Sequence, residues 1–259
     1  MPTKKSSIFR ESTVLVALIG LAGIIITSIL APLIIKAIES PATTVPNVVP
    51  TLPLPSGEYA AQLLSEARQW SLVAKDGFES NTLIWPEGDT SDSSGEATRS
   101  IVNGYYSWRL KANTEGATLW AAPNIDVTPD FYVAVDARNT KRLDTVAYAI
   151  SFRHQGAKHH YDFMIYPNQQ FSVHYRGQDQ TSTTTLVNLK NEIILSSENN
   201  RIAVIGIGPQ FWFYINGVFV DYLEDDRIPT GSYGLGVSVK NAGDEGFIEF
   251  DNFELRKAP

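Results

Sequence analysis

The 259-residue chain is 43% hydrophobic and 19% charged, an ordinary composition for a globular protein. Its formal net charge is −7 and no basic stripe follows residue 60, which argues against nucleic-acid binding, because phosphate binding needs a concentrated basic face. The absence of cysteine excludes disulfides and thiolate metal sites, and with the absence of an Asn-x-Ser/Thr sequon it is typical of a bacterial surface protein.

The first predicted element is a membrane-spanning helix. The 24 residues from 12 to 35 carry no charge, and at about 1.5 Å per residue such a helix crosses a hydrocarbon core about 30 Å thick. We expect a cytoplasmic tail over 1–11 and a single transmembrane helix over 12–38, with the rest of the chain outside the cell. The orientation follows from the cations that precede the segment, Lys4, Lys5 and Arg10. The alternative is a cleaved signal peptide, whose apolar region is normally only about 7–15 residues.

A linker and a short helix are predicted next. Residues 39–57 are rich in proline and threonine, which favours an extended, semi-rigid polyproline II stalk. Residues 58–70 form one short helix that Ser56 is placed to cap. The large apolar residues of this helix follow helical spacing and should pack on the following domain: Tyr59, Leu63, Ala67 and Trp70.

Residues 71–259 show the period-two alternation of β-strands, with no helical pattern between them. This predicts an all-β domain, an antiparallel β-sandwich of the jelly-roll kind. Asn216-Gly217 is the strongest hairpin signal and predicts a type I′ turn. The predicted strands are 105–110, 118–121, 131–137, 146–153, 161–166, 171–175, 201–207, 211–215, 218–223, 233–239 and 247–255.

The alternation also predicts a face of small side chains. Along 146–153 the large residues share one side, and the other side carries Ala147, Ala149, Ser151 and Arg153. Along 233–240 the small side carries Gly234, Gly236, Ser238 and Lys240. Such rows leave a shallow groove that suits a flat ligand. The same pattern is also expected of an ordinary sheet face exposed to solvent.

The order of short motifs resembles the concanavalin A-like lectin/glucanase superfamily, especially bacterial laminin-G-like and glucanase-like modules, which are often membrane-tethered. The likeness covers residues 70–257 and implies a concanavalin A-like jelly roll, but it does not specify a ligand. The motifs that carry it are Asp76-Gly-Phe78 before Trp85, Phe152-Arg153 before Tyr161-Asp-Phe163, Asn216-Gly217, Gly231-Ser-Tyr-Gly-Leu235 and Phe250-Asp-Asn-Phe253.

One stretch resembles the catalytic signature of laminarinase-type glucanases in the same superfamily. Glu249, Asp251 and Glu254 fit Glu-x-Asp-x-x-Glu, and retaining hydrolysis would need two of these carboxyls about 5–5.5 Å apart. A bulge would be needed to bring Glu254 to the same side as the other two. The match lies in the last strand, whereas the enzymes have it in mid-chain, so non-catalytic packing of that strand is favoured.

Metal sites are the weaker alternatives. His154, His159 and His160 flank a predicted hairpin, with Asp162 nearby, and imidazoles clustered there would bind a transition metal. The resemblance implies a structural calcium near the chain ends, with Asp76 and Asp251 as candidate ligands. Further carboxylates for calcium lie in the acidic stretches 224–226 and 87–92. In each case loop residues in water are the simpler interpretation, and no cofactor is required.

Aromatic side chains stack on sugar rings, and Trp85, Trp108, Trp120, Trp212 and Tyr214 are the candidates. Because 211, 213 and 215 should fill the core, Trp212 and Tyr214 point to the opposite face, and with Arg153 they form the predicted ligand site.

The sequence thus predicts a membrane-anchored, extracellular, non-catalytic recognition module that binds carbohydrate or a surface partner. The alternatives are a cell-surface glycoside hydrolase and a purely structural ectodomain.

Overall fold

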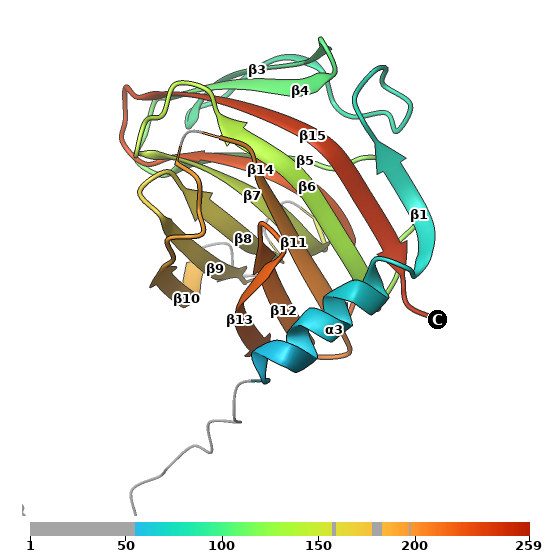
Figure 1. Cartoon of the computed structure of the whole chain (residues 1–259). Helices are drawn as coiled ribbons and strands as arrows, with labels where there is room; N and C mark the ends of the chain where they lie inside the picture. The colour runs from blue at the N-terminus through green and yellow to red at the C-terminus, as the bar shows by residue number, and fades with distance from the viewer. Residues whose placement is uncertain (1–54, 157–158, 178–182, 197) are drawn as a thin grey trace, which may run out of the picture. The chain divides into compact units, whose positions relative to one another are not determined.

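The computed structural model describes residues 55–156, 159–177, 183–196 and 198–259 (Figure 1). The chain divides into two units, Met1–Leu52 and Pro53–Pro259, and only the second contains described residues. The predicted cytoplasmic tail, the transmembrane helix and the linker up to residue 54 lie outside these ranges. In the part of the chain that the structure describes, no helix has the length and apolar character needed to cross a membrane.

The helix α3 (Gly57–Ala67) comes first, close to the predicted 58–70. Ser56 caps it, because its hydroxyl accepts a hydrogen bond of 3.2 Å from the amide of Tyr59. The helix ends earlier than predicted because the chain must be extended from Ser71 to pair with the last strand. Its buried side chains are Ala60, Leu63, Leu64 and Ala67.

Fifteen strands follow in the described residues, and every pairing between them is antiparallel. The predicted all-β antiparallel sandwich is therefore confirmed. The strands are β1 (Ser71–Asp76), β2 (Gly88–Ser91), β3 (Gly95–Val102), β4 (Tyr105–Ala112), β5 (Ala117–Ala121), β6 (Phe131–Asn139), β7 (Val146–His154), β8 (His160–Tyr166), β9 (Gln170–Arg176), β10 (Thr183–Lys190), β11 (Asn200–Ile207), β12 (Gln210–Ile215), β13 (Val218–Glu224), β14 (Ser232–Val239) and β15 (Glu245–Lys257).

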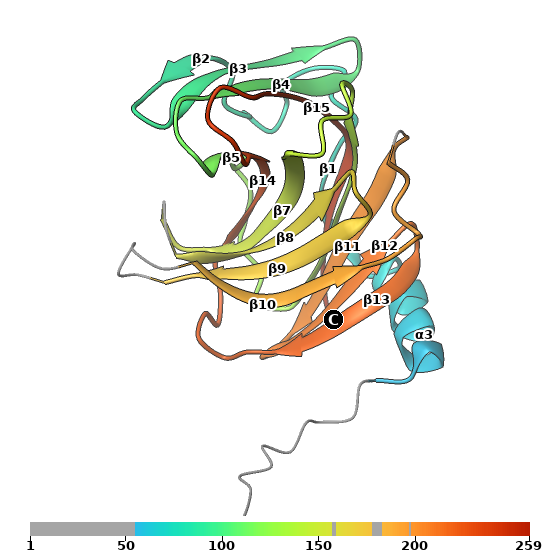
Figure 2. The same cartoon turned by 90° about the vertical axis from the view of Figure 1, so that its left-hand side faces the viewer.

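The described strands form two sheets (Figures 1 and 2). The nine-stranded sheet has the order β13-β12-β11-β6-β15-β4-β3-β2, with β1 added on β15. The six-stranded sheet has the order β10-β9-β8-β7-β14-β5. In Figure 2 the β2, β3 and β4 end of the larger sheet lies at the same end of the molecule as β5 and β14.

The core lies between the sheets and is filled by the large side of each alternating strand. Val146, Tyr148, Ile150 and Phe152 of β7 are all buried there, as the alternation predicts. Aromatic rings interlock across the layers; the ring of Phe152, for example, lies 5.2 Å from that of Phe211. Burying one such side chain contributes about 1.5–3 kcal/mol, so a register slip of one residue would be costly.

The β12–β13 hairpin turns at Asn216-Gly217, with φ of 52° and 80°. Positive φ at both central residues is the requirement of a type I′ turn, which confirms the prediction. Asn216 also donates its side-chain amide to the carbonyl of Ile193, 2.8 Å away, so the turn is fastened to the preceding loop.

The first and last strands join the two ends of the domain. Asp76 of β1 pairs with Phe253 of β15, and Trp85 donates its indole N–H to Asp76 over 3.0 Å. The Trp85 ring also meets the Phe253 ring edge to face at 5.2 Å. Two of the sequence motifs, one from each end of the domain, therefore form a single closing contact.

Candidate functional site

The outward face of the six-stranded sheet carries the predicted small residues in register. Gly236 of β14 pairs with Ala149 of β7, which pairs with Met164 of β8. In the next row Gly234 pairs with Ser151, which pairs with Asp162. On these two strands, β14 and β7, only small side chains or none project from the outward face, so the surface there is shallow.

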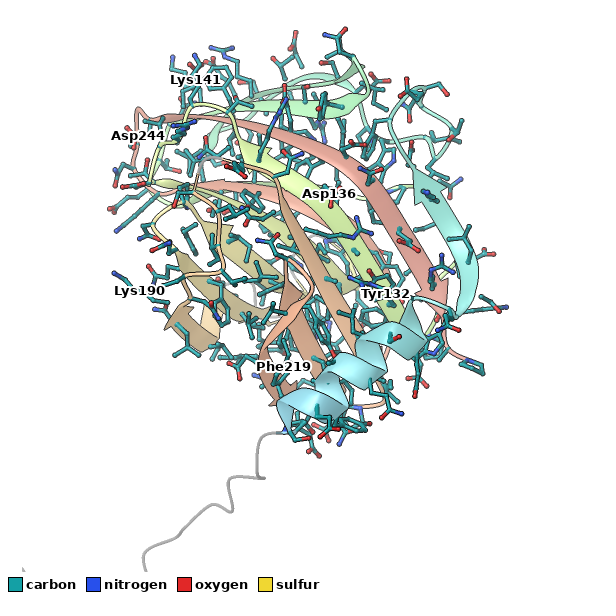
Figure 3. All side chains as sticks on the ribbon, viewed as in Figure 1. Tyr132, Asp136, Lys141, Lys190, Phe219 and Asp244 are labelled. Atoms are coloured by element: carbon teal, nitrogen blue, oxygen red, sulfur yellow. The ribbon has the colours of Figure 1, made fainter. Side chains whose placement is uncertain are left out.

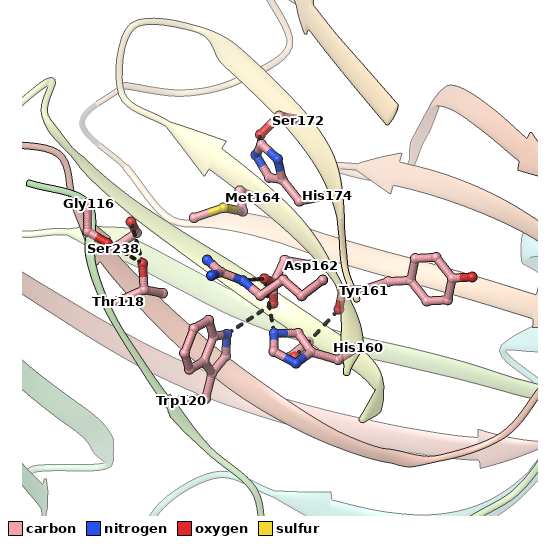
Figure 4. Close-up of polar contacts among 12 residues, drawn as sticks. Gly116, Thr118, Trp120, His160, Tyr161, Asp162, Met164, Ser172, His174 and Ser238 are labelled. Carbon is pink, nitrogen blue, oxygen red and sulfur yellow. Dashed lines mark hydrogen bonds and ion pairs between the residues drawn. The ribbon is translucent and has the colours of Figure 1, made fainter. Parts of the chain in front are cut away.

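Trp120 lies over this low surface. A Cβ atom at Gly236 would come within 3.1 Å of the indole Cδ1, so any other residue would push the ring away by a few tenths of an ångström. Trp120 belongs to the edge strand β5, and its indole N–H reaches past β14 and β7 to Asp162 on β8, 3.0 Å away. Figure 4 shows Trp120 and His160 converging on Asp162. The small residues therefore serve first to seat this indole, which is itself only partly buried.

Arg176, at the end of β9, approaches the same carboxylate from the other side. Its Nε donates to Oδ2 of Asp162 over 3.2 Å, and its guanidinium carbon lies 4.6 Å from the centre of the Trp120 ring. The side chain keeps 25% of its surface exposed. Trp120, Asp162 and Arg176 thus form one cluster that draws together strands β5, β8 and β9.

Asp162 is ionised in this cluster although its side chain is only 1% exposed. Burial disfavours the charge, but the contact with His160, the charge of Arg176 and the hydrogen bond from Trp120 outweigh it. Together they hold the pKa of Asp162 below its ordinary value. The Nε2 atom of His160 lies 3.3 Å from Oδ2 of Asp162, yet its direction does not make a hydrogen bond.

Two of the predicted metal-binding histidines do meet. The rings of His154 and His160 stack 4.6 Å apart, and the Trp120 ring meets His160 edge to face at 4.9 Å. Burial and the neighbouring His160 lower the pKa of His154 from 6.5 to about 4, so it is neutral at pH 7. His159 lies apart, against Tyr175. Within the described ranges, no group of three or more His, Asp or Glu side chains is arranged to hold a metal ion.

Hydroxyl groups border the cluster on two sides. The Thr118 and Ser238 hydroxyls lie 3.0 Å apart on neighbouring strands (Figure 4). His174 of β9 is bonded to Ser172 at 2.7 Å and to Thr185 at 3.2 Å, and burial lowers its pKa. Neutral donors and acceptors of this kind are what a ligand rich in hydroxyls requires.

Trp212 and Tyr214 point away from the core, as predicted, but α3 covers them. They are 3% and 1% exposed and pack with the buried side of the helix. The Tyr214 hydroxyl donates to the carbonyl of Ala60 over 2.8 Å. Figure 3 shows Tyr132 and Phe219 beside the same helix. Because neither ring has an open face, the geometry gives these residues a helix-docking role in place of the predicted sugar contact.

Arg153 is also removed from the predicted groove. A bulge in β7, with φ of 51° at Arg153, turns the side chain inward, where it is 2% exposed. The guanidinium donates to the carbonyls of Ile228, at 2.7 Å, and of Pro129 and Gly208, and it lies 4.6 Å from the Phe211 ring. The residue therefore holds three loops together on the core side of the sheet, whereas Trp212 and Tyr214 lie on the opposite side of β12, under the helix.

The three glucanase-like carboxylates stand on the outward face of the nine-stranded sheet. The required bulge is present, because the register of β15 shifts between Asp251 and Glu254. However, Glu249 is paired with Arg138 at 2.5 Å, and Glu254 is paired with Arg201 and Arg256. Burial raises the pKa of Asp251. Glu249 and Glu254 are therefore members of partly solvated salt bridges, and Asp251 is hydrogen-bonded to Asn252.

The carboxylates predicted for calcium are engaged by the protein. Asp76 accepts hydrogen bonds from the amide of Phe78 at 2.8 Å and from Trp85, so each of its oxygens has a donor. Asp251 accepts two hydrogen bonds from Asn252, at 2.6 and 3.1 Å. Asp76 is the last residue of β1, and Asp251 lies two residues before Phe253, the partner of Asp76 in β15. Calcium binding there stays a prediction.

The sequence singled out Trp120 only as one of five aromatic candidates, and it pointed to Asp162 only beside the histidines. Arg176 was not foreseen. The available signal was the glycine and alanine pair on adjacent strands, which provides room for a large ring from a neighbouring strand.

No family profile matches this sequence, and no curated protein matches it either. Solved structures do match. One is a galectin-like protein of unknown function from Bacillus subtilis, at 10% identity over 72% of this chain and 96% of that chain, with a TM-score of 0.52.

A laminarinase catalytic domain from Thermotoga maritima matches at 11% identity over 73% of this chain and 99% of that chain, with a TM-score of 0.52. An endo-β-galactosidase from Clostridium perfringens matches at 12% identity over 72% of this chain and 62% of that chain, with a TM-score of 0.51. At these identities the likeness is one of fold. This chain shares the antiparallel β-sandwich of galectin-like proteins and laminarinase catalytic domains.

Proposed function

We propose that the chain binds carbohydrate without cleaving it, through the outward face of the six-stranded sheet. The observation that carries the proposal is Trp120, a partly exposed indole that Asp162 and Arg176 hold in one orientation across the sheet. A fixed indole beside hydroxyl groups offers an apolar surface for a sugar ring and polar partners for its hydroxyls. In support, the solved structures with this fold include a laminarinase and an endo-β-galactosidase, both of which act on carbohydrate.

The same face argues against hydrolysis. Glycoside hydrolases generally use a pair of carboxyl groups, one of which must donate a proton. Among the outward residues of the described strands of this sheet, Asp162 is the one carboxylate, and its lowered pKa makes it a poor proton donor. On the other sheet, Glu249 and Glu254 are held in arginine pairs. The glycoside hydrolase therefore remains the alternative, with Glu249, Asp251 and Glu254 as its residues.

We further infer that the module is a concanavalin A-like jelly roll displayed outside the cell on a single membrane anchor. The uncharged run within 12–38 and the cations before it support this orientation. Protease treatment of intact cells tests it. Loss of residues 55–259 with retention of a short amino-terminal fragment is expected, and full protection would contradict external display.

Binding is tested on a glycan array with the full-length chain in detergent micelles. Trp120→Ala should weaken binding at least tenfold, because the ring contact is worth about 1.4 kcal/mol or more. Tyr59→Ala is the matched control, since Tyr59 is a half-exposed aromatic on α3, away from this sheet. Binding of no glycan, or equal effects of the two variants, would overturn the proposal.

A further inference from the structure

Arg176 contacts Asp162 through the Nε edge of its guanidinium. The Nε atom is bonded to Asp162, and the guanidinium lies over the Trp120 ring. These two contacts fix both the position and the plane of the group. Among described residues, none accepts a hydrogen bond from Nη1 or Nη2 of Arg176, and the side chain is a quarter exposed. A planar fork of donors held this way is suited to a trigonal or tetrahedral anion.

The surroundings of Arg176 favour such an anion. His160 pairs with Arg176 across β8 and β9, and His154 stacks on His160, so two imidazoles lie on the strands beside Arg176 in addition to Asp162. Asp162 is the nearby negative charge, and the cluster already encloses it with donors from Trp120 and Arg176. An anion that approaches from solvent therefore meets the guanidinium first and the enclosed carboxylate behind it.

We propose that this face selects glycans that carry an anionic group, a carboxylate or a sulfate ester, seated on the Nη atoms of Arg176 with the sugar ring beside Trp120. The inference rests on the proposed carbohydrate binding and adds the chemical class of the ligand. Asp162 acts as a positioning residue, because it orients the guanidinium and has no contact of its own with the ligand. The carboxylate and the sulfate share the same requirement, two oxygens in reach of one fork of donors.

The test compares matched probes by calorimetry on the full-length chain in detergent micelles. The probes are galacturonate oligomers, galactose oligomers of the same length as the neutral counterpart, and sulfated galactose oligomers. At least one anionic series should bind tenfold or more tightly than the neutral series. The preference should shrink as the salt concentration rises, because a partly exposed ion pair is screened. The two anionic series tell carboxylate and sulfate apart.

Variants assign the preference to Arg176. Arg176→Gln should remove the preference for anions, so that the anionic and the neutral oligomers bind this variant with equal affinity. Arg176→Lys keeps the charge but loses the planar pair of N–H donors, so its affinity for the anionic series should also fall about tenfold. Arg109→Gln is the matched control, an arginine on the other sheet that is 47% exposed. Thermal melting checks that each variant is folded. If one variant does not fold, the salt dependence of anion binding by the unmodified chain still tests the proposal.

The outcomes separate the two proposals. Equal binding of neutral and anionic oligomers, or an anionic preference that survives both Arg176 substitutions, overturns the ligand class and leaves carbohydrate binding in place. Binding of none of the three series, and of nothing on the glycan array, overturns both.

Discussion

Trp120 donates its indole N–H to Asp162 over 3.0 Å, although two strands lie between the strands that carry them. Gly236, on one of the two intervening strands, has no side chain to crowd the ring. Arg176 completes the arrangement from the far side. The stability of the sheet and the shape of the proposed binding surface therefore depend on the same few side chains.

Asp162→Asn should lower the free energy of unfolding by about 2–3 kcal/mol. The amide can still accept from Trp120, but Arg176 loses the charge that balances it. The expected cost is below the about 3–5 kcal/mol of a fully buried pair, because Arg176 can turn toward water. Urea unfolding measures the change, with the exposed Asp226→Asn as the control at less than about 0.5 kcal/mol. Equal stability of the two variants would show that the cluster does not act as a unit.

Gly236→Ala should displace Trp120. The added Cβ would stand 3.1 Å from the indole Cδ1, so the ring must shift by a few tenths of an ångström, which strains its hydrogen bond to Asp162. We expect a loss of about 1–2 kcal/mol in unfolding free energy and a weaker near-ultraviolet circular dichroism band from tryptophan. Gly57→Ala is the control, because the methyl group added there would meet no atom within 4 Å. An unchanged tryptophan band would contradict the seating of the ring on Gly236.

Acidification should destabilise the domain through His154. Its pKa is about 4 in the folded chain and near 6.5 in the unfolded chain, because burial and His160 oppose the charge while Asp162 favours it only in part. As the pH falls below 6.5 the unfolded chain takes up the proton first, so stability is full above pH 6.5 and declines toward pH 4. The loss is at most about 3 kcal/mol, and solvent at this partly buried ring reduces it.

The measurement is urea unfolding between pH 8 and pH 4 for the unmodified chain and for His154→Gln. Other carboxylates titrate in both proteins, so the difference between the two curves isolates His154. Parallel curves across the whole range would refute the assignment.

Leu64→Ala should loosen α3 from the nine-stranded sheet at a cost of about 2–4 kcal/mol, since Leu64 is buried in that interface. Water would then reach Trp212, and its fluorescence emission should move to longer wavelength. Ser65→Ala, which changes an exposed side chain of the same helix, should cost less than about 0.5 kcal/mol and leave the emission unchanged. A red shift of equal size in both variants would mean that the helix is not held by its buried side.

Glu249→Gln should leave the chain folded and change no activity. Its pair with Arg138 is partly solvated, so the expected cost is about 0–1 kcal/mol. Release of reducing sugar from a β-1,3-glucan is the assay, and we expect none from either protein. Hydrolysis by the unmodified chain that disappears in Glu249→Gln would restore the glucanase alternative.

The sequence predicted most of the fold because alternation is a local property. The inward residues of β7 and β14 were assigned correctly, and so was the turn at Asn216-Gly217. The strands that escaped prediction are β1, β2, β3 and β10, of which β2 and β10 lie at sheet edges. Edge strands bury little, so their apolar alternation is weak.

The site was harder to predict because it depends on which strands become neighbours. Alternation placed Trp212 and Tyr214 on the correct side of β12, but it carries no information about the helix that packs there. It failed at Arg153 because a bulge adds a residue and reverses the side on which the next residue points. The meeting of Trp120 with Asp162 requires the order β5-β14-β7-β8, which no local pattern specifies.

The position of α3 has a mechanical consequence. A pull applied to the chain ahead of Ser56 is transmitted to the strands through the helix, which is fastened by apolar contacts and by the bond from Tyr214 to Ala60. When a helix is pulled off from one end, apolar contacts of this kind break one after another. The hydrogen bonds between paired strands instead resist the force together. Under tension the helix should detach first and add its own length to the chain ahead of the strands, while the six-stranded sheet keeps its shape.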